Sequence, residues 1–420
     1  MDLALTDEQA MIRDAAADVL AERSASADVR RAIEQSAGRD DALWAALAGE
    51  LGWNALALPE AAGGLGLGAV EQTVLMEQLG RRVACVPYFS TACLAATALA
   101  GCREAAGATG WLAKIAEGAC SATLALPCEM PAGSWSLPVV AEEAASGYAL
   151  SGEIEQVIDG VRADLLLIPA RIANEGQSIG LFSIDVATAA GLTVTPLDTL
   201  DATRPIARIV LDETRVSRDA LLAVGGAAAR TMERTAWFAA LALAAEQLGG
   251  AQQCLDLTLD YTSQRVQFGR AIASFQAVKH RCAQMMVLIE AARSAVLGAA
   301  HAWDAETGAM PGAALRADIA AAKAAANDAY AFCAQEAIQL HGGVGFTWEY
   351  DPHLYFKRAQ ASGAQFGSTP HLLEWIASRA IDGGASRAID GGASPRDEAR
   401  AASPVSIATR ASAARAGALQ

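Results

Sequence analysis

Apolar residues recur at helical spacing through the first part of the chain. Thr6 and Gln9 match the capping-box pattern of a helix start. The apolar positions that follow fit one helical face, and they are Met11, Ile12, Ala15, Val19 and Leu20. Alanine- and leucine-rich segments continue to about Gly118, interrupted by a glycine-rich turn at residues 63–68. The pattern predicts an N-terminal helical domain over residues 1–118.

From Ser121 the pattern changes to short apolar runs separated by turn residues. The runs are SATLALP, YALSG, ADLLLIPA, IGLFSIDV, LTVTPL and ARIVLD, and each resembles a β-strand in length and composition. Roughly six strands over about 95 residues, without a helical stretch between them, are typical of an antiparallel sandwich or small barrel. We therefore expect a middle antiparallel β domain over residues 119–215.

Helical periodicity returns after Gly225. One apolar stripe with steps of three, four and seven consists of Phe275, Val278, Cys282, Met285, Ile289 and Val296. A further helix is expected to follow Pro311 and to end at Gly342 and Gly343, because glycine is preferred just after a helix. The pattern predicts an antiparallel four-helix bundle over residues 225–380, and hence a mainly α fold with a central β domain.

The last part of the chain differs in kind. The octapeptide SRAIDGGA occurs at residues 378–385 and again at 386–393, before a stretch rich in alanine, serine and arginine. Such low-complexity composition cannot build a packed core, so we expect residues 381–420 to be mostly disordered.

Composition narrows the functional classes. The chain is 53% hydrophobic and only 5% aromatic, which with its abundant alanine favours helix. The formal net charge of -15, without a basic stripe, argues against nucleic acid as a partner. The acidic residues after Met1 give no sign of a secretory signal, and without a run of about 18 charge-free apolar residues we expect no membrane span.

The cysteines and histidines give no sign of a metal site. Eight cysteines include no C-x-x-C pair, and five histidines include no H-x-x-x-H spacing. Neither a zinc site nor a disulfide framework is therefore indicated, and the thiols favour a reducing, cytoplasmic setting. Walker, G-x-G-x-x-G and G-x-S-x-G motifs are also missing from the sequence, and the glycines at 63–68 are best explained as a turn between helices.

Three sequence segments, taken together, indicate a candidate functional site. The first is RVQFGR at residues 265–270, followed by SFQAVKH at 274–280; the second is QLHGGVGFT at 339–347; the third is EMPAGS at 129–134. Singly, each has an ordinary explanation as a surface ion pair, a core residue or a helix end. In this order, and within a helix–strand–helix chain, they resemble the acyl-CoA dehydrogenases over most of residues 1–375.

The resemblance implies an FAD site shared between subunits. Arg265 would meet the FAD pyrophosphate of a neighbouring subunit, for which its planar fork is suited, and Phe268 would pack near the adenine. The third segment, with Ser134 as a substrate contact, matches less closely, since Met130 replaces a proline and Trp135 an aspartate. The implied cofactor residues are Arg265, Phe268, Phe275, Gln276, Gln339, Gly342, Gly343 and Thr369.

The family's reaction also needs a base. A carboxylate removes the α-proton of an acyl thioester while hydride leaves the β-carbon for flavin N5. In many members the base is the glutamate of a Y-E-G-T segment, and counting from Arg358 places Gly367 there. In other members the base lies about 26 residues before the arginine of the R-x-x-F-G segment. The resemblance aligns that arginine with Arg265, and the count falls on Ala239. Glu246 lies two turns further along that helix, and we favour a structural role for it.

A second departure from the family concerns the flavin ring. The W-I-T segment that holds the ring in the family corresponds to Gln156, Val157 and Ile158, and Ile158 has no hydroxyl. The motifs expected beside the adenosine of FAD thus match the family pattern, whereas the residues expected beside the flavin ring and at the base position differ from it.

Three hypotheses follow from this asymmetry. The chain is an acyl-CoA dehydrogenase whose base is not located, a catalytically silent partner in a heteromeric enzyme for bulky or steroid-derived acyl-CoA, or an acyl-CoA-binding scaffold without redox activity. By the resemblance we expect a homo- or hetero-oligomer, acyl-CoA as substrate and an electron-transfer flavoprotein as acceptor.

Overall fold

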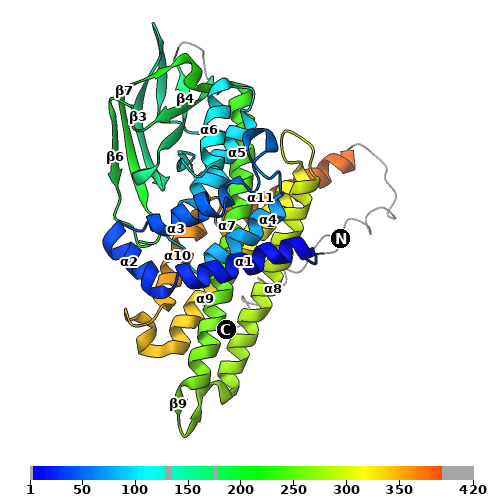
Figure 1. The fold of residues 1–420 in the computed structure, drawn as a ribbon. Helices are drawn as coiled ribbons and strands as arrows, with labels where there is room; N and C mark the ends of the chain where they lie inside the picture. The colour runs from blue at the N-terminus through cyan, green and yellow to red at the C-terminus, as the bar shows by residue number, and fades with distance from the viewer. Residues whose placement is uncertain (1–2, 128–134, 174–177, 390–420) are drawn as a thin grey trace.

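The computed structural model describes residues 3–127, 135–173 and 178–389, with a helical part, a β-sheet and a second helical part in chain order (Figure 1). The capping box at the first helix is confirmed, since the Gln9 backbone N–H donates to Thr6 Oγ1 at 3.2 Å and the Gln9 side chain accepts from the Thr6 backbone at 3.0 Å. The N-terminal helices are α1 (Asp7–Arg23), α2 (Ser26–Ser36), α3 (Asp41–Ala45), α4 (Ala69–Arg81), the π-helical segment η4 (Phe89–Ala95), α5 (Ala96–Gly101) and α6 (Ala106–Ala116).

The strands form one mixed sheet of eight strands, in the order β6-β7-β3-β2-β4-β5-β8, with β1 also paired to β4. Each of the six predicted apolar runs contributes a strand, whereas β2 and β8 were not predicted. The strands are β1 (Ala122–Leu124), β2 (Val140–Ala144), β3 (Gly147–Ile158), β4 (Leu165–Ile172), β5 (Ile179–Asp185), β6 (Leu192–Pro196), β7 (Ile206–Ser217) and β8 (Leu221–Val224).

The prediction of an antiparallel barrel or sandwich is wrong in two respects. Strand β4 pairs in parallel with β1 and, further along the same edge, with β2. The described sheet also runs from a β6 edge to a β8 edge and does not close. The sequence could not show this, because an apolar run records that a strand is buried but not the direction of its neighbour.

The second helical part consists of long helices packed side by side. Helix α7 (Gly226–Gln264) packs against α4, α8 (Gln276–Ala305) and α9 (Ala313–His341), and α10 (Pro352–Ala364) and α11 (Thr369–Ile389) pack on α9. Helix α9 begins after Pro311 and ends at Gly342, as predicted. Because α11 extends to Ile389, part of the expected disordered tail is helical, and residues 390–420 lie outside the described residues.

The two helical parts share one hydrophobic core. Side chains of η4 and α4 pack with those of α7 and α9 in this core, while a smaller second cluster lies within the sheet. The crossing of α4 and α7 is so close that a Cβ on Gly80 would lie 2.0 Å from the Glu246 carbonyl oxygen. Close packing of this kind fixes the N-terminal helices against the helices that carry the predicted site.

Two further observations concern membrane-spanning helices and the cysteine and metal-binding side chains. Within the described residues, α8 alone is long and apolar enough to cross a membrane, and it packs against α7 and α9. The described cysteines are all free, and no group of three or more histidine, cysteine or acidic side chains in the described part of the chain could hold a metal.

Candidate functional site

The first group of predicted residues lies on a small hairpin between α7 and α8. Strands β9 (Val266–Gln267) and β10 (Arg270–Ala271) pair antiparallel, and the turn between them needs positive φ at Phe268 and Gly269. The Phe268 ring is 92% exposed and meets Phe275 edge-on at 6.2 Å. The exposed Arg265 side chain forms no hydrogen bond or ion pair with the residues that the structure describes. The Arg265 guanidinium and the Phe268 ring are therefore exposed and accessible to a ligand or a partner.

The second group lies at the end of α9, beside this hairpin. The Tyr261 ring stacks on the His341 ring at 4.3 Å, which joins the last turn of α7 to the last turn of α9. Gln339, Gly342 and Gly343 are exposed, and a Cβ on either glycine would have nothing within 4 Å. The structure thus brings Arg265 and the G-G segment to one end of the bundle, with open backbone that a dinucleotide can approach.

Thr369 lies apart from this end. Its hydroxyl donates to Asp328 Oδ1 at 3.1 Å, and Asp328 precedes Gln339 by eleven residues, or about 16 Å along α9. Ser134, the predicted substrate contact, lies outside the described residues. The predicted site residues therefore do not form one compact site within this chain.

The turn that replaces the family's base is closed by its own side chains. Gly367 has φ +109°, and a Cβ there would lie 2.7 Å from the Leu372 side chain. The preceding Phe366 also has positive φ, is fully buried and packs edge-on against Phe89 of η4 at 5.9 Å. A side chain at position 367 would be strained by this φ and would require Leu372 to move.

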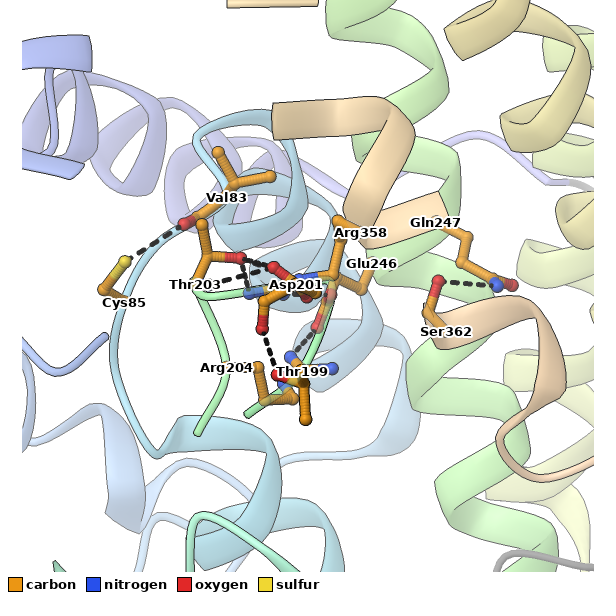
Figure 2. A network of polar contacts seen from close by, with 10 residues as sticks. All are labelled: Val83, Cys85, Thr199, Asp201, Thr203, Arg204, Glu246, Gln247, Arg358 and Ser362. Atoms are coloured by element: carbon orange, nitrogen blue, oxygen red, sulfur yellow. Dashed lines mark hydrogen bonds and ion pairs between the residues drawn. The ribbon is translucent and has the colours of Figure 1, made fainter. Parts of the chain in front are cut away.

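Glu246 is held in a buried ion network that joins three parts of the fold (Figure 2). Its two oxygens accept from Arg358, at 2.6 Å, and from Arg204. Arg358 also pairs with Asp201 at 2.6 Å, from the loop before β7. Burial alone would raise the pKa of Glu246, but the charges of Arg204 and Arg358 outweigh burial and lower it. The two arginine charges therefore make Glu246 a weak base, which favours a structural role for it.

The surroundings of Glu246 leave little space. A cavity of about 10 Å³ lies beside the network, lined in part by Tyr88, Phe89 and Arg204. That volume suits about one water molecule and not an acyl chain. The alternative base position, Ala239, is fully buried in the apolar middle of α7.

The flavin-ring segment in the sheet is also filled. Val157 and Ile158 are buried, and the Ile158 carbonyl accepts a hydrogen bond from Thr123 Oγ1 at 2.8 Å. The Thr123 hydroxyl, from β1, is thus used within the chain.

A second polar cluster, which the sequence did not suggest, lies under the Gly367 turn. It consists of Lys323 and Asn327 on α9, Gln247 on α7 and Ser362 on α10, and we call it the Lys323 cluster. Lys323 Nζ donates to Asn327 Oδ1 at 2.5 Å and to the Ser362 carbonyl at 3.2 Å. Its only signal in the sequence is a charged residue inside the apolar run ADIAAAKAAA.

A larger cavity lies elsewhere and contains none of the predicted residues. It has a volume of about 310 Å³ and lies between α1, α4 and α8. Most of the charges that line it are already paired, for example Arg293 with Glu77 at 2.5 Å and Arg81 with Asp256 at 2.6 Å. We assign no chemistry to it.

Comparison with known proteins identifies the family. The acyl-CoA dehydrogenase N-terminal domain matches residues 6–119, and the C-terminal domain matches residues 216–381. Acyl-CoA dehydrogenase IpdE2 of Mycobacterium tuberculosis is 32% identical over 372 residues, which cover 89% of this chain and 97% of that protein.

Solved structures agree with this match. A chain of the ChsE4-ChsE5 complex from Mycobacterium tuberculosis is 26% identical, with a TM-score of 0.79, over 91% of this chain and 99% of that one. A chain of the steroid acyl-CoA dehydrogenase Tcur3481-Tcur3483 is 30% identical, with a TM-score of 0.76, over 90% and 99% of the two chains. The chain therefore belongs to the acyl-CoA dehydrogenase family.

Proposed function

We propose that this chain is a subunit of an FAD-dependent acyl-CoA dehydrogenase and provides the adenosine and diphosphate side of a cofactor site completed by another chain. Proton abstraction and hydride transfer take place on the other chain. The observation that carries the proposal is the contrast between the open end of the bundle, at Arg265 and Gly342, and the closed turn at Gly367.

The open end fits the diphosphate part of FAD. Arg265 is exposed and unpaired among the described residues, and a guanidinium can donate two parallel charge-assisted bonds to a phosphate. Gly342 and Gly343 leave the backbone accessible, and Phe268 offers a ring face for stacking. When bound, FAD accepts the hydride that leaves the acyl β-carbon.

The ring side does not fit in this chain. Ile158 offers no hydroxyl, Gly367 offers no carboxylate, and Leu372 and Phe366 occupy the space around the turn. Glu246 is buried and paired with two arginines, which lower its pKa and make it a weak base, and the cavity beside it is too small for an acyl chain. The residues present can therefore hold one end of the cofactor but not perform the chemistry.

The relatives favour an assembly of two different chains. ChsE4-ChsE5 is described as a complex, and Tcur3481-Tcur3483 as a steroid acyl-CoA dehydrogenase. We extend this to the present chain by proposing a bulky, steroid-derived acyl-CoA as the substrate of the assembly. An electron-transfer flavoprotein is the proposed acceptor for the reduced cofactor.

The proposal is tested by purifying the chain alone, recording its visible spectrum and titrating it anaerobically with acyl-CoA thioesters of increasing bulk. We expect a colourless protein, or flavin that no thioester bleaches. Flavin that bleaches on titration would overturn the proposal and show an independent enzyme with its own base. A colourless protein that nevertheless binds acyl-CoA tightly would instead favour a scaffold.

A further inference from the structure

We infer that the Lys323 cluster positions the turn between α10 and α11 and keeps it closed over the place where the family's base would stand. The inference rests on the proposed function, and it deepens that function by naming the residues that hold the Gly367 turn in its closed conformation.

The contacts form a chain from α9 to the turn. Asn327 Nδ2 donates to the Gly367 carbonyl at 3.0 Å, so the side chain of one helix holds the backbone of the turn directly. Asn327 Oδ1 in turn accepts from Lys323 and, at 2.8 Å, from Gln247 Nε2. Gln247 also donates to Ser362 Oγ at 3.0 Å, which ties α10 just before the turn (Figure 2).

The turn needs such support because its backbone is strained. Phe366 has φ +51° and Gly367 has φ +109°. A non-glycine residue in the left-handed region costs on the order of 1–3 kcal/mol when nothing compensates. The hydrogen bond to the Gly367 carbonyl and the packing of Phe366 on Phe89 supply that compensation.

Lys323 makes the cluster sensitive to charge. It is fully buried, and its two acceptors are a neutral amide and a carbonyl. The charged group that acts on it is Glu246 on α7, which is already paired with two arginines. Burial lowers the pKa of Lys323 to about 7, so protonation below neutral pH places an uncompensated ammonium beneath the turn.

The test is hydrogen–deuterium exchange of the full chain, read on the peptide that contains residues 363–372. The Leu372 amide donates to the Ser368 carbonyl at 3.0 Å, so its exchange reports opening of the turn. We expect Asn327→Ala to speed this exchange at least tenfold. Thr258→Val is the matched control, since Thr258 is also buried but its hydroxyl donates to the Cys254 carbonyl of its own helix, and it should leave the peptide unchanged.

The pH profile tests whether the charge of Lys323 acts on the turn. After correction for intrinsic exchange, opening of the turn should increase as the pH falls from 8 to 6 in the wild type and should be flat in Lys323→Met. If Lys323→Met does not fold, Asn327→Asp is used instead. It removes the Nδ2 donor to the Gly367 carbonyl and pairs Lys323 with a carboxylate, so the turn should open at both pH values.

Exchange within twofold of wild type in Asn327→Ala, or an unchanged pH profile without Lys323, would overturn the inference. Failure of the proposed function is seen separately, as bleaching of flavin in the unmodified chain.

Discussion

At the scale of single residues, two charged side chains lie buried among the helices of the second helical part. Glu246 and Lys323 are both buried, but they are stabilised differently. Glu246 is paired with two guanidinium groups, whereas Lys323 has only neutral acceptors. The two residues therefore respond in different ways to substitution and to pH.

Glu246→Gln should strongly destabilise the fold. The substitution leaves Arg204 and Arg358 buried without their shared counter-charge, and removing one partner of a buried ion pair typically costs about 3–5 kcal/mol. The loss is measured as the free energy of unfolding in denaturant. Glu153→Gln, which breaks an exposed pair with Arg208, is the control and should change little; equal effects in the two variants would contradict a structural role for Glu246.

Lys323 should make stability rise with pH above neutrality. Its pKa is about 7 in the folded chain and near its ordinary value of 10.5 when unfolded. Between these values the unfolded state binds more protons, so the free energy of unfolding increases with pH, by at most about 1.4 kcal/mol per unit. Denaturation of Lys323→Met between pH 7 and 8.5 should lose this slope, and a slope equal to that of the wild type would show that another group is responsible.

At the scale of elements, the turn between α10 and α11 is built for glycine. Its positive φ and the Leu372 side chain both exclude a larger residue at position 367. Restoring the family's glutamate therefore should not restore the family's reaction, because the surrounding residues, and not only the missing carboxylate, have changed.

Gly367→Glu should lower the melting temperature without producing acyl-CoA-dependent bleaching. Backbone strain alone contributes about 1–3 kcal/mol, and contact with Leu372 adds to it. Gly363→Ala, four residues earlier on α10 with open space around it, should instead be neutral or stabilising by about 0.5–1 kcal/mol. A folded Gly367→Glu variant that is bleached by a thioester would contradict the closed turn.

Much of the architecture could be predicted from the sequence, because helices and strands leave periodic patterns. The capping box at Thr6, the end of α9 at Gly342 and six of the strands follow from local rules. The parallel pairing of β4 could not be predicted, since strand direction depends on contacts between distant segments. The short strand β2, with two adjacent glutamates, gives too weak an apolar signal.

In the candidate site, too, local motifs could be predicted and contacts between distant residues could not. The motifs around Arg265 and Gln339 can be read locally, and the structure brings them together at one end of the bundle. The partners of Glu246 could not be predicted, because Arg204 and Arg358 come from a loop and a helix far away in the sequence. A charged residue inside an apolar helix was the only available signal for both Glu246 and Lys323.

At the scale of the whole molecule, one end of the bundle is open and the catalytic half is closed. The exposed aromatic side chains Phe268, Phe346 and Trp348 are 92%, 69% and 57% exposed. Large aromatic side chains are costly to leave in water, so their exposure on the hairpin and on the segment after α9 favours a partner that covers them. We therefore expect FAD binding to be a property of the assembly.

The most direct measurement is the FAD content of a complex with a second family member that has a glutamate at the base position, co-expressed with this chain. We predict that Arg265→Ala in this chain alone removes most of the FAD from the complex, while Arg218→Ala, in the short helical turn between β7 and β8, leaves the FAD content unchanged. If the complex with Arg265→Ala retains full FAD and full thioester-dependent bleaching, this chain does not contribute to the cofactor site and the central claim is wrong.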